Sequence, residues 1–185
     1  MIGIPVRKGD IVIDLGANRG LFSRYCLERG ASVHAYEPHP QCFARLKELQ
    51  KTFPNLMAYN EDVSLQSGKA SLHLHENHDD APDIFSESSS LIAEKANVGS
   101  HSVEVKVTSI SEILEQFERI RLIKIDIEGS EYDIYPALID FSDRIDNVFM
   151  EPHLTVMPNR REDDKAMRLL IEEKCLSKKF NLDWF

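Results

Sequence analysis

The stretch Ile11-Val-Ile-Asp-Leu-Gly-Ala-Asn-Arg-Gly20 decides the fold. It opens with β-branched residues typical of a strand, turns at two glycines, and leads into residues 21–29, whose apolar positions have helical spacing. Gly30 ends this predicted helix, and a second extended run follows at residues 32–36. The short strand–helix–strand connection predicts that the two strands are parallel.

The same alternation continues along the chain. Apolar spacing predicts further strands at residues 55–59, 70–75, 102–107, 122–126 and 147–151, with one closing strand in 180–185. Further helices are predicted at residues 40–51, 111–117, 131–139 and 161–173, with Ser111 as a cap and Pro136 inside the third of them. The pattern indicates an α/β fold with a mostly parallel central sheet and helices on both faces, in a single domain over residues 1–185.

Composition excludes several classes of protein. The 185 residues are 42% hydrophobic and 29% charged, with a net charge of −9 and a pI of about 5.3. This charge repels a phosphate backbone, so we expect no nucleic-acid partner. Cys26, Cys42 and Cys175 are an odd number without CxxC spacing, which favours a reducing cytoplasm over a disulfide framework or a structural zinc site. No leader or membrane span is expected, and hence no membrane partner.

Histidines are concentrated in one segment. His73, His75 and His78 alternate along a predicted strand and the loop after it. No fourth ligand stands at suitable spacing, so a solvated strand face is favoured and no metal site is predicted.

The glycine turn and a later acid suggest a nucleoside cofactor. The missing side chains of Gly16 and Gly20 are expected to let a ligand approach the start of a helix. A dinucleotide motif needs glycine where this chain has Asn18, whereas Asp14 is suited to an ammonium group. Glu37, 21 residues beyond Gly16, ends the second strand, where a carboxylate accepts hydrogen bonds from ribose hydroxyls. S-adenosylmethionine has both an ammonium group for Asp14 and ribose hydroxyls for Glu37. The competing interpretation is that the glycines only form a tight turn and that the two acids are solvated at the strand ends.

Three segments resemble the FkbM family of S-adenosylmethionine-dependent methyltransferases. They are DLGANRG at residues 14–20, YEPHP at 36–40 and KIDIEGSE at 124–131. The resemblance spans about residues 8–153 and takes in a serine run at 88–91 and Glu151-Pro-His153. It implies a class I, Rossmann-like methyltransferase fold, with the cofactor at the carboxyl ends of parallel strands and methyl transfer mostly to oxygen, on sugars and natural-product hydroxyls.

The resemblance also assigns residues to roles. For the cofactor it implies Asp14, Gly16, Ala17, Asn18, Gly20, Glu37 and Pro38, and for the acceptor Ser89, Ser90 and Glu151. Asp62 is added to the cofactor residues because it stands just past the third strand, where many class I methyltransferases contact the adenine amino group. The chain departs from the family at Asp62, where a small apolar residue is usual, and at Ser111, which replaces an acid.

Catalysis is expected after the most apolar strand. Lys124, Asp126, Glu128 and His153 are the candidate catalytic residues. Methyl transfer needs alignment of the reactants and, for an alcohol, removal of a proton, for which Asp126, Glu128 and His153 are alternative bases. The competing interpretations are a structural Lys–Asp pair at residues 124 and 126, and a structural histidine at 153.

The sequence therefore predicts an oxygen methyltransferase for a hydroxyl on a sugar, a glycan or a small metabolite. The acceptor would lie under the polar loop at residues 76–100. Two alternatives stay open. One is a methyltransferase-like binding subunit without turnover, motivated by the single closing strand; the other is a nicotinamide-dependent reductase, disfavoured by Asn18. The oligomeric state is left open, with a dimer among the alternatives.

Overall fold

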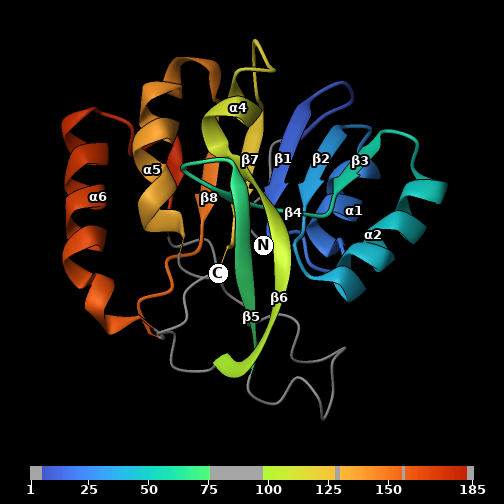
Figure 1. The fold of residues 1–185 in the computed structure, drawn as a ribbon. Coiled ribbons are helices and arrows are strands. Elements are labelled where there is room, and N and C mark those ends of the chain that lie inside the picture. Colours follow the sequence, from blue (N-terminus) through green and yellow to red (C-terminus); the bar gives the residue numbers. More distant parts are fainter. Residues whose placement is uncertain (1–5, 76–97, 128–129, 156, 183–185) are drawn as a thin grey trace.

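A parallel six-stranded sheet forms the centre of the protein (Figure 1). The computed structural model describes residues 6–75, 98–127, 130–155 and 157–182. The sheet has the strand order β3 (Leu56–Tyr59), β2 (Ser32–Tyr36), β1 (Ile11–Leu15), β7 (Leu122–Ile125), β8 (Val148–Met150) and β9 (Phe180–Asn181). Each neighbouring pair is parallel, as predicted. The carboxyl ends of all six strands therefore meet at one edge of the sheet, where open α/β sheets bind their ligands.

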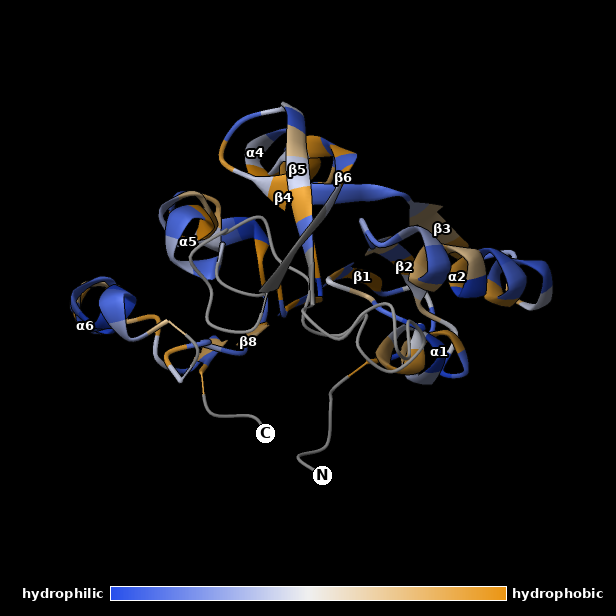
Figure 2. Cartoon of the chain, turned by 60° about the horizontal axis from the view of Figure 1, so that its bottom comes forward, coloured by the Kyte–Doolittle hydropathy of each residue, from blue (hydrophilic) through white to orange (hydrophobic). Residues whose placement is uncertain are grey.

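Helices cover both faces of this sheet, which confirms the predicted architecture (Figure 2). Residues from α1 (Leu21–Leu27) and α2 (Pro40–Thr52) share one apolar cluster with the strands. Residues from α4 (Ile110–Leu114), α5 (Glu131–Asp140) and α6 (Arg161–Glu173) share the other. Two short 3-10 turns, η2 (Ser142–Arg144) and η3 (Pro158–Arg160), lie in the connections on either side of β8.

A second, three-stranded sheet lies over the α4 and α5 face of the main sheet (Figures 1 and 2). Its order is β4 (Glu61–Ser64), β6 (Val98–Ser109) and β5 (Gly68–His75). β6 pairs antiparallel with β5 and parallel with β4. The sequence predicted the two long strands, with β6 shorter than it is, but not β4, because the four residues of β4 include two acids and a serine.

One local prediction, the cap of α4, was wrong, whereas the predicted closing strand is present. α4 begins at Ile110 and ends at Leu114, so Ser111 lies in its first turn and Ser109 precedes the helix. Ser109 instead ties the helix to the β4–β5 connection: its hydroxyl donates to the Leu65 carbonyl, and its amide donates to the Ser67 hydroxyl. The closing strand has only two residues, and it runs parallel to β8.

The strand β1 shows how the two cores are built. Val12 belongs to the cluster with α1 and α2, while Ile13 and Leu15 belong to the cluster on the other face. Between them Asp14 is completely buried, at 0% exposure. A charged residue is almost never buried without partners. Asp14 is therefore the first indication that the carboxyl end of β1 is built for more than packing.

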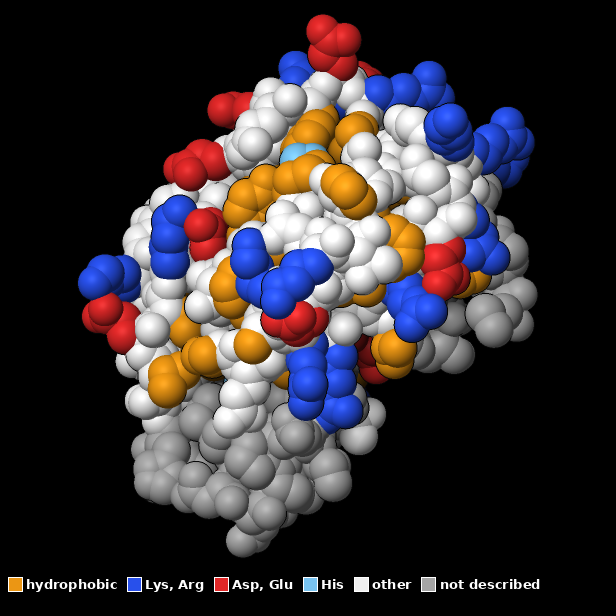
Figure 3. Space-filling model, turned by 90° about the vertical axis from the view of Figure 1, so that its right-hand side faces the viewer, with side chains coloured by type: hydrophobic (Ala, Val, Ile, Leu, Met, Phe, Trp, Pro, Cys, Tyr) orange, Lys and Arg blue, Asp and Glu red, His pale blue; other side chains and the backbone are white. Residues whose placement is uncertain are grey.

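The surface over α2 and β3 is mixed in character (Figure 3). Apolar side chains are interspersed with basic and acidic ones across this face. Among the described residues, no helix combines the length and the apolar character that a membrane span requires.

Candidate functional site

The loop after β1 is held by its own backbone. The amides of Gly16 and Ala17 both donate to the Tyr36 carbonyl, at 3.1 and 3.0 Å, and the Gly20 amide donates to the Ala17 carbonyl. Asn18 has a φ of 49°, a left-handed conformation that asparagine tolerates better than most residues. The amides of Gly16, Ala17 and Gly20 are thus already bonded within the protein, and they are not donors waiting for a ligand.

The reason for the two glycines also differs from the prediction. A Cβ at Gly16 would lie 1.7 Å from the Asp126 carbonyl oxygen, and one at Gly20 would lie 2.7 Å from Leu46 Cδ2. Both residues have positive φ, 70° and 80°. The missing side chains therefore make room for β7 and α2, and the prediction that they make room for a ligand was wrong in its physical reason.

Glu37, an acid of the predicted cofactor site, is oriented by backbone amides on both of its carboxylate oxygens. Its Oε2 accepts the Asn18 amide at 2.7 Å, and its Oε1 accepts the His39 amide at 2.8 Å. Burial raises the pKa of Glu37 to about 7, although these two amide bonds oppose the shift. Each oxygen keeps a further lone pair, which is what recognition of two ribose hydroxyls requires.

Asn60 extends this corner of the site and was missed by the sequence analysis. Its side-chain amide donates to the carbonyls of Glu37 and Pro38, both at 2.9 Å. Asp62 follows in β4, where burial raises its pKa to about 7 and Glu131 adds a smaller effect in the same direction. The available signal was the position of Asn60, which directly follows β3, the strand after YEPHP.

A buried ammonium joins the two halves of the site. Lys124 Nζ donates to the Gly16 carbonyl at 2.6 Å, and it lies 3.5 Å from Asp14 Oδ1 and 3.2 Å from Asp126 Oδ2. Burial lowers the pKa of Lys124, but the Asp14 and Asp126 carboxylates outweigh it, so the pKa is raised. The predicted pair of Lys124 and Asp126 exists, and the same ammonium also connects β7 to β1 through Asp14 and Gly16.

Asp14 faces into the protein in this structure. The Ser23 hydroxyl donates to its Oδ2 at 2.6 Å, and burial raises its pKa while Lys124 lowers it. The expected contact between Asp14 and a ligand's ammonium group thus stays a prediction. The observed partners give Asp14 a structural role, because it connects α1 to Lys124.

His153 is held on both ring nitrogens. Its Nδ1 lies 2.5 Å from Glu131 Oε1, and its Nε2 lies 3.5 Å from Asp126 Oδ1. Glu131 is completely buried in the first turn of α5, where the helix dipole favours a negative charge. Sequence reasoning gave Glu131 no role, although it is the last residue of the KIDIEGSE segment and begins the helix after β7.

Glu151 joins the same group from the neighbouring strand. One ligand atom from each of Asp126, Glu151 and His153 lies within 4.8 Å of the others, and all three residues are half-buried. The structure therefore brings together three of the residues predicted to act on the acceptor. Glu128, Ser89 and Ser90 lie outside the described residues.

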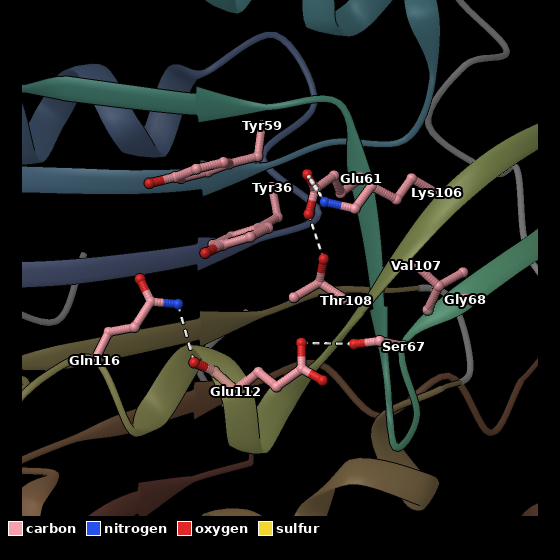
Figure 4. A pocket seen from close by; sticks show the side chains of 10 residues that line it. All are labelled: Tyr36, Tyr59, Glu61, Ser67, Gly68, Lys106, Val107, Thr108, Glu112 and Gln116. Atoms are coloured by element: carbon pink, nitrogen blue, oxygen red, sulfur yellow. Dashed lines mark hydrogen bonds and ion pairs between the residues drawn. The ribbon is translucent and has the colours of Figure 1, made fainter.

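A cleft of about 600 Å³ lies elsewhere, between the main sheet and the second sheet (Figure 4). The Tyr36 and Tyr59 rings stack with 4.6 Å between their centroids on its β2 and β3 side, and Glu61 pairs with Lys106 on its β4 and β6 side. Its other lining residues are Ser67, Gly68, Val107, Thr108, Glu112 and Gln116. The predicted site residues do not line this cleft, so we keep it separate from the candidate site.

The sequence matches a family model and several known proteins. Residues 14–178 match the model of the methyltransferase FkbM domain. The hexuronic acid methyltransferase AglP of Haloferax volcanii is 27% identical over 92% of this chain. The 31-O-demethyl-FK506 methyltransferase FkbM of Streptomyces tacrolimicus is 28% identical over 82% of it. The chain spans 64% and 68% of the lengths of these two relatives.

A solved structure was also found. The methyltransferase FkbM of Methylobacillus flagellatus KT aligns with a TM-score of 0.48 at 14% identity, over 72% of this chain and 30% of that one. The family model and the names of the two relatives describe methyltransferases, which speaks against the reductase alternative. Because the family model covers most of the sequence, this chain belongs to the FkbM methyltransferase-domain family.

Proposed function

We propose that the protein uses S-adenosylmethionine to methylate a hydroxyl oxygen on a sugar, a glycan or a small metabolite. One observation carries the proposal: Lys124 Nζ contacts both the Gly16 carbonyl and Asp126 Oδ2. The loop expected to hold the cofactor and the acids expected to face the acceptor are therefore neighbours. Such proximity is the first requirement for a transfer between two bound molecules.

The described residues suit the cofactor. Glu37 is oriented by two amides and retains acceptor capacity for the ribose hydroxyls, while Asp62 is close enough to Glu37 to influence its pKa. When bound, S-adenosylmethionine supplies a methyl group on a positively charged sulfur. The carboxylates at the ends of β1, β2 and β7 favour a cation at this edge of the sheet.

The acceptor must lose a proton as its oxygen gains the methyl group. Asp126, Glu128 and His153 were the alternative bases, and the described geometry favours the Asp126–His153 pair as the proton acceptor. Glu131 holds Nδ1 of His153, so that Nε2 is directed toward Asp126. A histidine oriented by a carboxylate is a common arrangement for a general base.

The relatives support the acceptor class. AglP is named a hexuronic acid methyltransferase, and FkbM is named for methylation at an oxygen of FK506. The FK506 name specifies an oxygen as the methyl acceptor, and the AglP name specifies a sugar acid, which carries hydroxyl and carboxyl oxygens. We expect the residues around His153 to decide which hydroxyl this chain methylates, and residues 89 and 90 remain predicted contributors.

Calorimetry with Glu37→Gln tests the cofactor assignment. Glutamine keeps the size of the side chain but removes the charge that strengthens hydrogen bonds from the ribose. We expect the affinity for S-adenosylhomocysteine to fall roughly tenfold or more. Glu48→Gln, at an exposed position of α2, is the matched control and should leave the affinity unchanged.

Two results would contradict the proposal. If the unaltered protein bound neither S-adenosylmethionine nor S-adenosylhomocysteine at millimolar concentration, the cofactor assignment would be wrong. The binding-subunit alternative would be favoured if the protein bound the cofactor but neither the unaltered protein nor Asp126→Asn methylated any hydroxylated acceptor.

A further inference from the structure

We propose that Asp126, Glu151 and His153 bind a divalent metal ion at the carboxyl ends of β7 and β8. Each residue offers one ligand atom, and these atoms lie within 4.8 Å of one another. Imidazole nitrogens and carboxylate oxygens are common ligands of catalytic metal ions, and such sites bind the ion through about three protein ligands and keep other positions open. Binding of the ion does not depend on the proposed function, but its role in catalysis does.

A residue outside the triad supports the assignment. Glu131 is completely buried, and its Oε1 lies 2.5 Å from Nδ1 of His153. Metal-binding histidines almost always present their second ring nitrogen to a carboxylate or carbonyl, which fixes the tautomer and the orientation of the ring. Here that contact leaves Nε2 as the nitrogen facing Asp126 Oδ1, the side on which the ion would lie.

Asp126 has an equivalent support. Lys124 Nζ lies 3.2 Å from Oδ2 of Asp126, while Oδ1 is the oxygen that faces His153. The ammonium thus holds one carboxylate oxygen and leaves the other turned toward the triad. Two of the three ligands are therefore oriented by buried neighbours, which distinguishes this group from a chance gathering of surface acids.

The local charge also favours a cation. Three carboxylates lie in this region, those of Asp126, Glu131 and Glu151. The nearby ammonium of Lys124 is shared between Asp126 and Asp14. A divalent ion would offset this negative charge. The imidazole favours manganese or zinc over magnesium or calcium, which prefer sites made entirely of oxygen ligands.

The ion would deepen the proposed function. An alcohol oxygen bound to a divalent metal loses its proton more readily, because the metal stabilises the alkoxide. With an ion bound, Nε2 of His153 would serve as a ligand rather than as the base, and the acceptor's proton would leave to solvent. In the metal-free protein, the Asp126–His153 pair takes the proton. The two routes differ in whether a chelator abolishes methylation.

Manganese binding to the complete chain tests the inference without any methyl transfer. Protein freed of metal with a chelator is titrated with Mn²⁺ and followed by electron paramagnetic resonance. We expect one ion per chain, strongly reduced binding in Asp126→Asn and His153→Ala, and binding weakened about 10- to 100-fold in Glu131→Gln. His73→Ala, on β5 in the second sheet, is the matched histidine control and should bind as the unaltered protein does.

A second measurement needs no variant, in case the substitutions impair folding. Bound Mn²⁺ should broaden the imidazole proton resonances of His153 in the unaltered protein at substoichiometric amounts, before those of His34 or His73. Equal binding by His153→Ala and the unaltered protein, both folded by circular dichroism, would overturn the inference. So would the absence of stoichiometric binding at millimolar Mn²⁺ and Zn²⁺.

Calorimetry with S-adenosylhomocysteine on the same metal-free protein separates the two proposals. Cofactor binding without metal binding would remove the metal site and leave the proposed function. Metal binding without cofactor binding would do the reverse.

Discussion

The two halves of the main sheet hold their polar groups in different ways. Around β1 and β2, backbone groups do most of the holding: the Tyr36 carbonyl fixes the glycine loop, and two amides orient Glu37. Around β7 and β8, side chains hold one another, as Lys124 holds Asp126 and Glu131 holds His153. One half depends on the position of backbone groups, and the other on ion pairs and hydrogen bonds between side chains.

This difference predicts different sensitivities to mutation. A change in the β1 half should act through the conformation of the backbone, and hence through folding. A change in the β7 half should act through charge. Lys124 is the exception, because it belongs to both halves.

The largest effect is expected at Gly16. In Gly16→Ala the new methyl group meets the Asp126 carbonyl at 1.7 Å and the residue must keep a φ of 70°, so we expect a loss of at least ~4 kcal/mol in unfolding free energy. Gly9→Ala isolates the conformational part, since Gly9 has a φ of 86° and nothing within 4 Å of a Cβ. It should cost about 1–2 kcal/mol. Equal losses in urea titrations would refute the packing role of Gly16.

A smaller effect is expected at the bridge between the halves. Lys124→Met leaves Asp14 buried without its ammonium partner, which should cost about 3 kcal/mol in unfolding free energy. Lys106→Met removes an ammonium from an ion pair in which Lys106 is 64% exposed, and it should cost about 0.5 kcal/mol or less. Adding Asp14→Asn to Lys124→Met should restore part of the loss. If it does not, the bridge does not stabilise the fold through this pair.

Most of the fold follows from the sequence because its signals are local. The strands of the main sheet and the helix at residues 161–173 have apolar periodicity that needs no knowledge of distant contacts. β4 escaped prediction because its four residues become a strand only by pairing with β6, more than 40 residues later in the sequence. The cap of α4 was misplaced for a similar reason, since Ser109 is engaged by the β4–β5 connection.

In the candidate site, too, the sequence indicates some residues by their local position and misses contacts between distant elements. Glu37 is marked by its place at the end of a strand, and the structure supplies the two amides that orient it. The partnership of Glu131 with His153 joins residues 22 positions apart on different elements, and no spacing rule indicates it. The glycines were found for the wrong reason, because the groups that fill their space, Asp126 and Leu46, come from other elements.

The last prediction is a pH dependence that acts differently on the fold and on cofactor binding at Glu37. Burial raises the pKa of Glu37 from 4.5 and that of Asp62 from 3.8, both to about 7. Between these values the folded state binds more protons than the unfolded state, so the contribution of both carboxyls to stability is present at low pH and is lost as the pH rises to about 7. Urea titrations of the cofactor-free protein from pH 4 to pH 8 measure this loss.

Cofactor affinity should change in the opposite direction, because ribose hydroxyls donate to the ionised carboxylate. Below about pH 7 the binding protein must first lose the Glu37 proton, so we expect the affinity for S-adenosylhomocysteine to fall up to tenfold, about 1.4 kcal/mol, for each unit of decreasing pH. In Glu37→Gln this dependence should flatten. If the affinity of the unaltered protein were constant from pH 6 to pH 8, Glu37 would not act as a carboxylate toward the ribose, and the β1 half would bind its ligand by other groups.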